Sequence, residues 1–190
     1  MKTFAVLFAI ALTLAGFATS AAPFSGNAVG YVKVVAPAGG FVLLGVPLSG
    51  TNNLLNTTIR LPDGYDGTMI FRYDPALQNY RDAIQWVEDF GWFSPSDPTP
   101  TVNPGEGIWL RNISGNELRF TFVGSILEGS YSTAIPGGNN LNLASSAVPR
   151  GVNLGDPAGP PNPGTLGFPA ADGDCIFVFD VATQNYKDPY

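Results

Sequence analysis

The sequence predicts an all-β protein built from two related β-rich units of the sandwich or small-barrel type, the second of which is incomplete at its C-terminus. Three observations predict this fold class. Turn formers are abundant, with 23 glycines and 17 prolines among 190 residues, while only 13% of residues are charged. Short runs rich in valine and aromatic residues alternate with these turn formers, which is typical of strands joined by tight turns. A long segment of the chain also recurs near its C-terminus.

The recurrence is a near-copy of residues 66–82 at residues 172–188, in which ten of the seventeen aligned positions are identical. Further upstream, matching glycines and prolines lie 99 residues apart, and the offset grows to 106 across an insertion around residues 155–164. Similarity at a fixed offset indicates that one supersecondary unit occurs twice. We therefore expect both copies to fold around the same strand-turn-strand motif.

These matches divide the chain into an N-terminal segment at 1–22, a first β-unit at 23–124 and a second β-unit at 125–190. The first unit continues for about forty residues beyond Asp82, whereas the second ends two residues after the matching Asp188. We expect the second unit to lack its second half, either because the sequence is a fragment or because something else supplies the missing strands.

Residues 1–22 are typical of a cleaved export signal. Lys2 supplies a basic start, an almost unbroken apolar run follows at 4–17, and small residues end the segment. The run is shorter than the roughly 20 residues that a spanning helix needs, and no second run of that length follows. The sequence therefore predicts a secreted protein, whether extracellular, at the cell surface or periplasmic, with no membrane span after signal removal.

The outer elements of the first unit are predicted as two hairpins. Val-rich alternation predicts a strand at 30–35 that returns at 41–46 through a Pro-Ala-Gly-Gly turn. A last hairpin is expected to join 107–111 to 117–123 through a Ser-Gly-Asn turn. Between the two hairpins, residues 52–59 are expected to form one short helical turn.

The repeated motif itself is predicted to be a strand, a turn and a returning strand. The strand covers residues 68–73, and the turn begins at Asp74, whose side chain can bond the backbone ahead of it while the next residue, a proline, fixes φ. The returning strand then places Tyr80 across from Phe71 or Tyr73. Such a cross-strand aromatic pair stabilises a sheet.

The composition excludes several functional classes. The chain carries a formal charge of −6 with its acids scattered, which disfavours nucleic acid as a partner. The lack of histidine removes the Ser-His-Asp and Cys-His catalytic sets and the usual zinc and copper ligands, so no cofactor or metal is expected. The single cysteine, Cys175, lies in an apolar run and is predicted to be a small buried side chain.

Paired carboxylates, as in glycosidases, are the remaining route to catalysis. Several acids of the first unit, Asp63, Asp66 and Asp74 among them, precede Gly or Pro and are predicted to be turn residues. Glu106 stands within a Pro-Gly-Glu-Gly segment, where it is expected either to accept backbone N–H groups of an adjacent loop or to act as a ligand. Asp-Gly turns also leave calcium binding open, although no EF-hand spacing is present.

Trp86, Trp92 and Trp109 are the candidate binding residues. The first two, with Phe90 and Phe93 nearby, fall in the stretch of the first unit that least resembles a regular strand. Flat aromatic rings stack on sugars or bind a protein partner. The alternative is that these rings pack at the open end of the core.

The order of several short motifs resembles a group of secreted, uncharacterised two-unit β-repeat proteins from planctomycete and verrucomicrobial bacteria. The resemblance covers essentially all of the mature chain and implies export and architecture, but no activity or binding residues. In that group the second unit closes with a Gly-Trp and a Gly-Glu strand, which this sequence does not reach. The motifs are Val29-Gly30-Tyr31-Val32, Pro37-Ala38-Gly39, Asp66-Gly67, Gly91-Trp92, Pro104-Gly105-Glu106-Gly107, Phe122-Val123-Gly124, Gly129, Val148-Pro149, Asp172-Gly173-Asp174 and Gln184-Asn185-Tyr186.

Export, repetition and missing catalytic chemistry together favour a non-enzymatic structural or interaction protein of the cell surface or extracellular matrix. The alternative is a carbohydrate-binding module that uses exposed Trp86, Trp92 and Trp109, and a distant third is a carboxylate-only glycosidase. Expected partners are extracellular polysaccharide or other surface proteins. A half unit would also leave an open sheet edge through which copies of the chain could associate.

Overall fold

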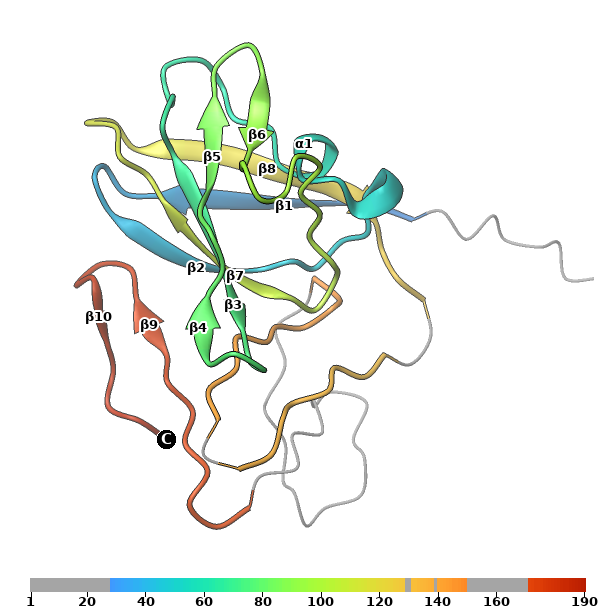
Figure 1. Cartoon of the computed structure of the whole chain (residues 1–190), viewed down its shortest axis with the longest axis vertical. Coiled ribbons are helices and arrows are strands. Elements are labelled where there is room, and N and C mark those ends of the chain that lie inside the picture. The colour runs from blue at the N-terminus through green and yellow to red at the C-terminus, as the bar shows by residue number, and fades with distance from the viewer. Residues whose placement is uncertain (1–27, 129–130, 139, 150–170) are drawn as a thin grey trace, which may run out of the picture.

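The computed structural model describes residues 28–128, 131–138, 140–149 and 171–190. Within these ranges the chain forms ten strands, all paired antiparallel, and two short helical turns, which confirms the predicted all-β character. The predicted signal at 1–22, Gly129 and the insertion around 155–164 lie outside the described residues. Figure 1 shows the first unit as the layered body of the molecule, with the C-terminal hairpin beside it.

Two antiparallel sheets of the first unit pack face to face. The smaller sheet pairs β1 (Val29–Ala36) with β8 (Leu118–Ser125) along their whole length. In Figure 1 this pair runs across the strands of the larger sheet. The larger sheet has the order β2-β7-β3-β5-β6, with β4 pairing with the outer half of β3. Its strands span Phe41–Gly45 (β2), Met69–Asp74 (β3), Asn79–Tyr80 (β4), Ile84–Val87 (β5), Gly91–Phe93 (β6) and Gly107–Arg111 (β7).

Alternate side chains of both sheets fill the space between them. Because successive strand residues point to opposite faces, the residues of β1, β2 and β8 that face the core are buried or half-buried, and most of their neighbours are more exposed. Full burial of one such apolar side chain stabilises the fold by about 1.5–3 kcal/mol. The inner residues of these strands and of β3 and β7 are Val34, Ala36, Val42, Leu44, Ile70, Ile108, Leu110, Leu118, Phe120 and Phe122.

The prediction of two outer hairpins is wrong. The chain does turn between β1 and β2 and between β7 and β8, but β1 pairs with β8 whereas β2 pairs with β7. Each turn therefore carries the chain from one sheet to the other. In this arrangement the apolar faces of consecutive strands meet across the core, whereas a hairpin would place them side by side on one face.

Asn112 links the β1–β2 turn to the β7–β8 turn by hydrogen bonds. Its side chain is completely buried, and its amide nitrogen donates to the carbonyl oxygens of Pro37, at 2.9 Å, and of Asn116, at 2.8 Å. Its amide oxygen accepts the N–H of Ser114 at 3.0 Å. The Asn112 backbone N–H also donates to Gly40 O at 2.9 Å. A buried amide satisfied in this way fixes the relative position of the two sheets at one end of the sandwich.

The predicted helical turn is confirmed. It consists of a 3-10 turn at Thr51–Asn53 (η1) and one α-helical turn at Leu55–Thr58 (α1). The side chains of Leu55 and Ile59 are fully buried in the core. The Leu55 N–H donates to Pro100 O at 2.8 Å. This segment therefore closes the edge of the sandwich near β6.

The turn of the repeated motif has the same hydrogen bonds in both copies, although the strand before it is shorter in the second copy. In the first, Asp74 Oδ1 accepts the N–H of Ala76 at 3.0 Å, and Tyr73 lies opposite Tyr80 with ring centroids 5.2 Å apart, as predicted. In the second, β9 (Phe179–Asp180) pairs with β10 (Asn185–Tyr186), and Asp180 Oδ1 accepts the N–H of Ala182 at 2.9 Å. The equivalent glutamines adopt the same left-handed backbone, with φ of 50° at Gln78 and 55° at Gln184.

The described part of the second unit has little other regular structure. Residues 131–138 and 140–149 contain no strand; within them an isolated bridge joins Ala144 to Glu106 of the first unit. Beyond the β9–β10 hairpin, Ile176 and Tyr190 exchange backbone hydrogen bonds of 3.1 Å in each direction. Ile176 and Tyr190 lie 106 residues after Ile70 and Ile84, which are also opposite each other in an antiparallel pair.

Replacing Asp74 tests the first turn. Desolvation raises the pKa of the Asp74 carboxyl, but hydrogen bonds from Leu77, Arg81 and Ala76 outweigh it and hold the pKa below its ordinary value of 3.8. The charged carboxylate therefore stabilises the fold above about pH 4, and this stabilisation is lost as the pH falls through the folded-state pKa. We expect Asp74→Ala to lower the free energy of unfolding more at pH 7 than at pH 2.

The measurement is urea unfolding at both pH values. Asp74→Asn is the matched control, because it keeps an oxygen acceptor for Ala76 and removes only the charge. An equal loss for Asp74→Ala at pH 7 and pH 2 would show that the charge of Asp74 contributes nothing to the turn.

Candidate functional site

The structure does not bring Trp86, Trp92 and Trp109 together on one exposed surface. All three are buried, and Trp92 has no exposed surface at all. Trp86 and Trp92 lie opposite each other on β5 and β6, where their inward positions pack the rings edge to face with centroids 5.4 Å apart. The Trp92 indole N–H donates to Ile59 O at 2.7 Å. This corrects the expectation of exposed tryptophans: core packing, the alternative left open by the sequence, describes Trp86 and Trp92.

Trp109 lies on the opposite face of the larger sheet, where the C-terminal hairpin covers it. Strand β7 alternates, so that Ile108 and Leu110 enter the core while Trp109 points outward. Its ring meets Phe179 edge to face with centroids 4.7 Å apart, and it meets Tyr186 at 6.2 Å. The C-terminal hairpin therefore docks on the larger sheet through an aromatic cluster centred on Trp109.

An open cleft of about 670 Å³ lies beside this cluster, between the outer face of the larger sheet and the hairpin. Its lining is mostly apolar and aromatic, with two charged residues and one amide at the side. Concave sites of this size and character are the usual places for ligands and partner side chains. The lining residues are Phe41, Phe71, Tyr80, Arg81, Asp82, Ala83, Trp109, Phe179 and Gln184.

Gln184 fixes the hairpin to the first strand of the larger sheet. Its Oε1 accepts the N–H of Phe41 at 2.7 Å, and its Nε2 donates to Phe41 O at 3.0 Å. The same Nε2 donates to Val181 O within its own turn at 2.7 Å. The side-chain amide of Gln184 thus forms hydrogen bonds with both the backbone N–H and the backbone C=O of Phe41, 143 positions earlier in the sequence.

Gln78, the equivalent residue of the first unit, makes the same contacts in the opposite direction. Its Oε1 accepts the N–H of Leu141 at 2.8 Å, and its Nε2 donates to Leu141 O at 3.2 Å and to Pro75 O at 2.6 Å. Each glutamine of the sequence repeat therefore holds the backbone of a residue far away in the sequence, Gln184 that of Phe41 and Gln78 that of Leu141. Sequence reasoning missed this reciprocal clamp, although the identity of the two glutamines within the repeat was the signal for it.

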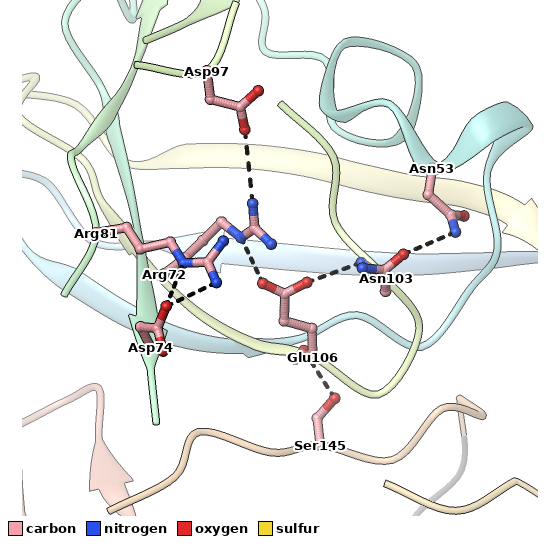
Figure 2. A network of polar contacts seen from close by, with 8 residues as sticks. All are labelled: Asn53, Arg72, Asp74, Arg81, Asp97, Asn103, Glu106 and Ser145. Carbon is pink, nitrogen blue, oxygen red and sulfur yellow. Dashed lines mark hydrogen bonds and ion pairs between the residues drawn. The ribbon is translucent and has the colours of Figure 1, made fainter. Parts of the chain in front are cut away.

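Glu106 is the centre of a polar network (Figure 2). Its Oε1 pairs with Arg72 Nε at 2.6 Å, and its Oε2 accepts the backbone N–H of Asn103 at 3.1 Å. The Ser145 hydroxyl donates to Glu106 O at 3.1 Å, which ties the second unit to the same loop. Asp97 lies 3.9 Å from the other side of Arg72.

This geometry confirms that Glu106 accepts a backbone N–H of its adjacent loop. Both of its carboxylate oxygens are engaged, and its side chain and that of Arg72 are 21% and 14% exposed. A carboxylate held by a guanidinium and a backbone N–H fixes the loop before β7. The described residues contain no group of three or more acids or cysteines that could hold a metal ion.

Cys175 is exposed, which corrects the prediction of a buried side chain. The equivalent strand of the first unit, β3, is covered on both sides by β5 and β7. Among the described residues, the strand around Cys175 has a neighbour on one side only, namely the residues near Tyr190.

In the described part of the chain no helix is long and apolar enough to cross a membrane.

Replacing Trp92 tests its place in the core. Because its ring is fully buried, Trp92→Ala removes the packing of the whole side chain and leaves Ile59 O without its donor. We expect the free energy of unfolding to fall by about 3–5 kcal/mol. Phe90→Ala on the same hairpin is the matched aromatic control, since Phe90 is 67% exposed; its loss should stay below about 1 kcal/mol. Similar small losses for both variants in urea unfolding would contradict the burial of Trp92.

Replacing Gln184 tests the clamp on Phe41. Desolvation in the docked hairpin raises the pKa of the Tyr186 phenol above 10.0, and nearby Tyr80 raises it further. Docking therefore favours the neutral phenol and weakens as the pH rises past 10. We expect Gln184→Ala to loosen the hairpin and return the pKa of Tyr186 toward 10.0, as followed by NMR of labelled tyrosine. Asn185→Ala, on the same hairpin but outside the clamp, is the control; an unchanged pKa in Gln184→Ala would refute the clamp.

Comparison of the chain with protein-family models, with curated proteins and with solved structures finds no match in any of the three. The resemblance to secreted bacterial two-unit proteins therefore stays a prediction from the sequence motifs. The function has to be inferred from the geometry of the cleft, the hairpin and the second unit.

Proposed function

We propose that this chain is an exported, non-enzymatic structural or interaction protein of the cell surface or extracellular matrix, built from two related β-units. The N-terminal pattern at residues 1–22 supports export. The repeat from 66–82 to 172–188, together with the matching turns, supports the relationship between the units. The reciprocal glutamine contacts support a fixed arrangement of the two units.

The observation that carries this proposal is the exposure of apolar residues in the second unit at positions that are covered in the first. Val42 is 6% exposed, whereas Leu141, which the repeat offset of 99 residues places at the equivalent position, is 60% exposed. Phe177, the equivalent of the half-buried Phe71, is 48% exposed. Soluble monomers rarely leave large contiguous apolar patches uncovered, and such patches mark interaction sites.

Several features support a role without catalysis. The acids of the first unit are used in structure: Asp74 holds a turn, and Glu106 holds a loop with both oxygens engaged. The sequence has no histidine to serve as a general base or nucleophile partner. The carbohydrate-binding alternative rested on exposed tryptophans, whose rings are buried. Protein is therefore the partner class that we propose.

The test follows the full-length chain in a bacterium that exports it. We expect the protein to be found outside the cytoplasm, with its N-terminus between residues 21 and 23 by mass spectrometry. We also expect it to be retained by the cell envelope or matrix. Recovery of the cytoplasmic protein with residues 1–22 intact would contradict export.

A surface variant tests the interaction part of the proposal. Phe177→Asp places a charge in the exposed apolar area of the second unit, and Leu77→Asp is the control, because Leu77 is 74% exposed on the first unit. We expect Phe177→Asp to reduce envelope retention about tenfold and Leu77→Asp to leave it unchanged. Equal retention of both variants would contradict an interaction through the second unit, and hydrolysis of polysaccharide by the purified protein would contradict a non-enzymatic role.

A further inference from the structure

We propose that copies of this chain associate head to tail, with an acidic tip of one copy docked on a basic face of the next. The acidic tip is the β5–β6 turn with the loop beside it, and its members are Asp63, Asp66, Glu88, Asp89, Phe90 and Phe93. The basic face is the outer face of the smaller sheet, and its members are Val29, Tyr31, Lys33, Val35, Arg119 and Val123. This inference rests on the proposed role as a structural or interaction protein and names a second copy of the chain as the partner.

The basic face is apolar at its centre and carries two cations. Tyr31 and Val123 lie opposite each other on β1 and β8 and are 70% and 43% exposed. Lys33 and Arg119 extend from the same side of the sheet, and within the bounds of the two strands there is no acid. Arg119 pairs with Glu117 just before β8 at 2.6 Å, whereas Lys33 has no ion pair among the described residues. In a chain of formal charge −6, an exposed face of this kind favours an acidic partner surface.

The acidic tip combines exposed aromatic rings with acids. Phe90 and Phe93 are 67% and 37% exposed, and their rings meet edge to face with centroids 5.7 Å apart. Asp66 Oδ1 accepts the backbone N–H of Glu88 at 3.0 Å, which holds the acidic loop against the β5–β6 turn. Among the described residues none of the acids of the tip takes part in an ion pair. The tip is therefore an apolar centre with negative charge around it, the counterpart of the basic face.

The tip offers side chains to a partner, because the backbone of its edge strand is already bonded. Strand β6 is an edge of the larger sheet. Asn56 Oδ1 accepts the backbone N–H of Trp92 in this strand at 2.5 Å, and Asn56 Nδ2 donates to Trp92 O at 3.3 Å. These bonds occupy the outward backbone groups in the middle of β6, where an open edge would pair with another strand. A partner therefore contacts the rings of Phe90 and Phe93.

The two surfaces lie on opposite sides of the same sandwich. Trp92 faces the core, so its neighbour Phe93 lies on the outer side of the larger sheet, whereas Tyr31 lies on the outer side of the smaller sheet. Figure 1 shows the β5–β6 turn at the end of the first unit away from the C-terminal hairpin. A tip therefore does not reach the face of its own chain. A contact between two different surfaces that does not close into a ring produces an open chain of copies.

Charge favours this pairing over the two symmetric ones. Face against face would bring Lys33 and Arg119 of one copy toward the same cations of another. Tip against tip would bring the acids of two copies together. Like charges that meet across an interface are unfavourable. Tip on face instead joins opposite charges and buries the rings of the tip against Tyr31 and Val123.

The test is sedimentation equilibrium of the purified exported chain over a series of concentrations. We expect the average mass of the wild type to rise beyond that of a dimer. Lys33→Glu on the face and Glu88→Lys on the tip should each weaken association about tenfold, because each places like charges in the contact. Phe90→Ala should weaken it by a similar factor through loss of the buried ring. Lys187→Glu is the matched control, because this exposed lysine lies outside both surfaces and its reversal should leave association unchanged.

A mixture of two variants separates a specific contact from a general effect of net charge. The Lys33→Glu variant keeps an intact tip, and the Glu88→Lys variant keeps an intact face. An equimolar mixture should therefore associate about tenfold more tightly than either variant alone. Each variant is first checked by its thermal unfolding midpoint, and Phe90→Ala keeps the inference testable if a charge reversal does not fold.

Any of the following results would overturn the inference: a wild type that stays monomeric, a mass that stops at a dimer, association that Lys33→Glu and Glu88→Lys leave unchanged, equal weakening by Lys187→Glu, or a mixture that stays dissociated. A mass that stops at a dimer would show a symmetric contact instead. Retention of the wild type by the envelope without self-association would sink the head-to-tail inference alone, whereas loss of retention as well would sink the proposed function.

Discussion

Strand β7 is the element on which the rest of the structure depends, because its two faces serve two different interfaces. It lies between β2 and β3 in the larger sheet, so its backbone is paired on both sides. Its inner residues Ile108 and Leu110 are fully buried against the smaller sheet. Its outer residue Trp109 receives the C-terminal hairpin. The core of the first unit and the docking of the second therefore share one strand, and the loop before it is fixed by Glu106.

The two copies of the sequence repeat make matching polar contacts, but their apolar surroundings differ. Gln78 and Gln184 hold the opposite unit by the same pair of backbone hydrogen bonds. Only the first unit, however, presents a paired strand with an outward tryptophan among the described residues. The exposed apolar side chains of the second unit follow from this difference, because its strand at 175–178 has the sequence of a covered strand without the described neighbour that would cover it.

Local elements were predictable wherever a side chain acts on its own backbone. Asp74 begins its turn by accepting N–H groups two and three residues ahead, and this chemistry can be read from adjacent residues. The Tyr73–Tyr80 pair follows from the turn, and the short helical turn at 51–58 was also expected. The two crossing turns were not predictable, because alternation of apolar residues is the same in a hairpin and in a chain that passes between two sheets. Strand pairing in this sandwich joins residues that are far apart in the sequence, such as Val29 and Ser125.

The sequence by itself determined the all-β class, the repeated turn and the lack of histidine-based chemistry, since these depend on composition and on neighbouring residues. Only the tertiary structure decided which aromatic residues are accessible. Trp86 and Trp92 face the core because of the side of the sheet on which they lie, whereas Trp109 is covered by a hairpin more than sixty residues further along the chain. Cys175 is exposed for the converse reason. Burial of a strand residue requires neighbouring strands, and among the described residues the strand around Cys175 has a neighbour on one side only.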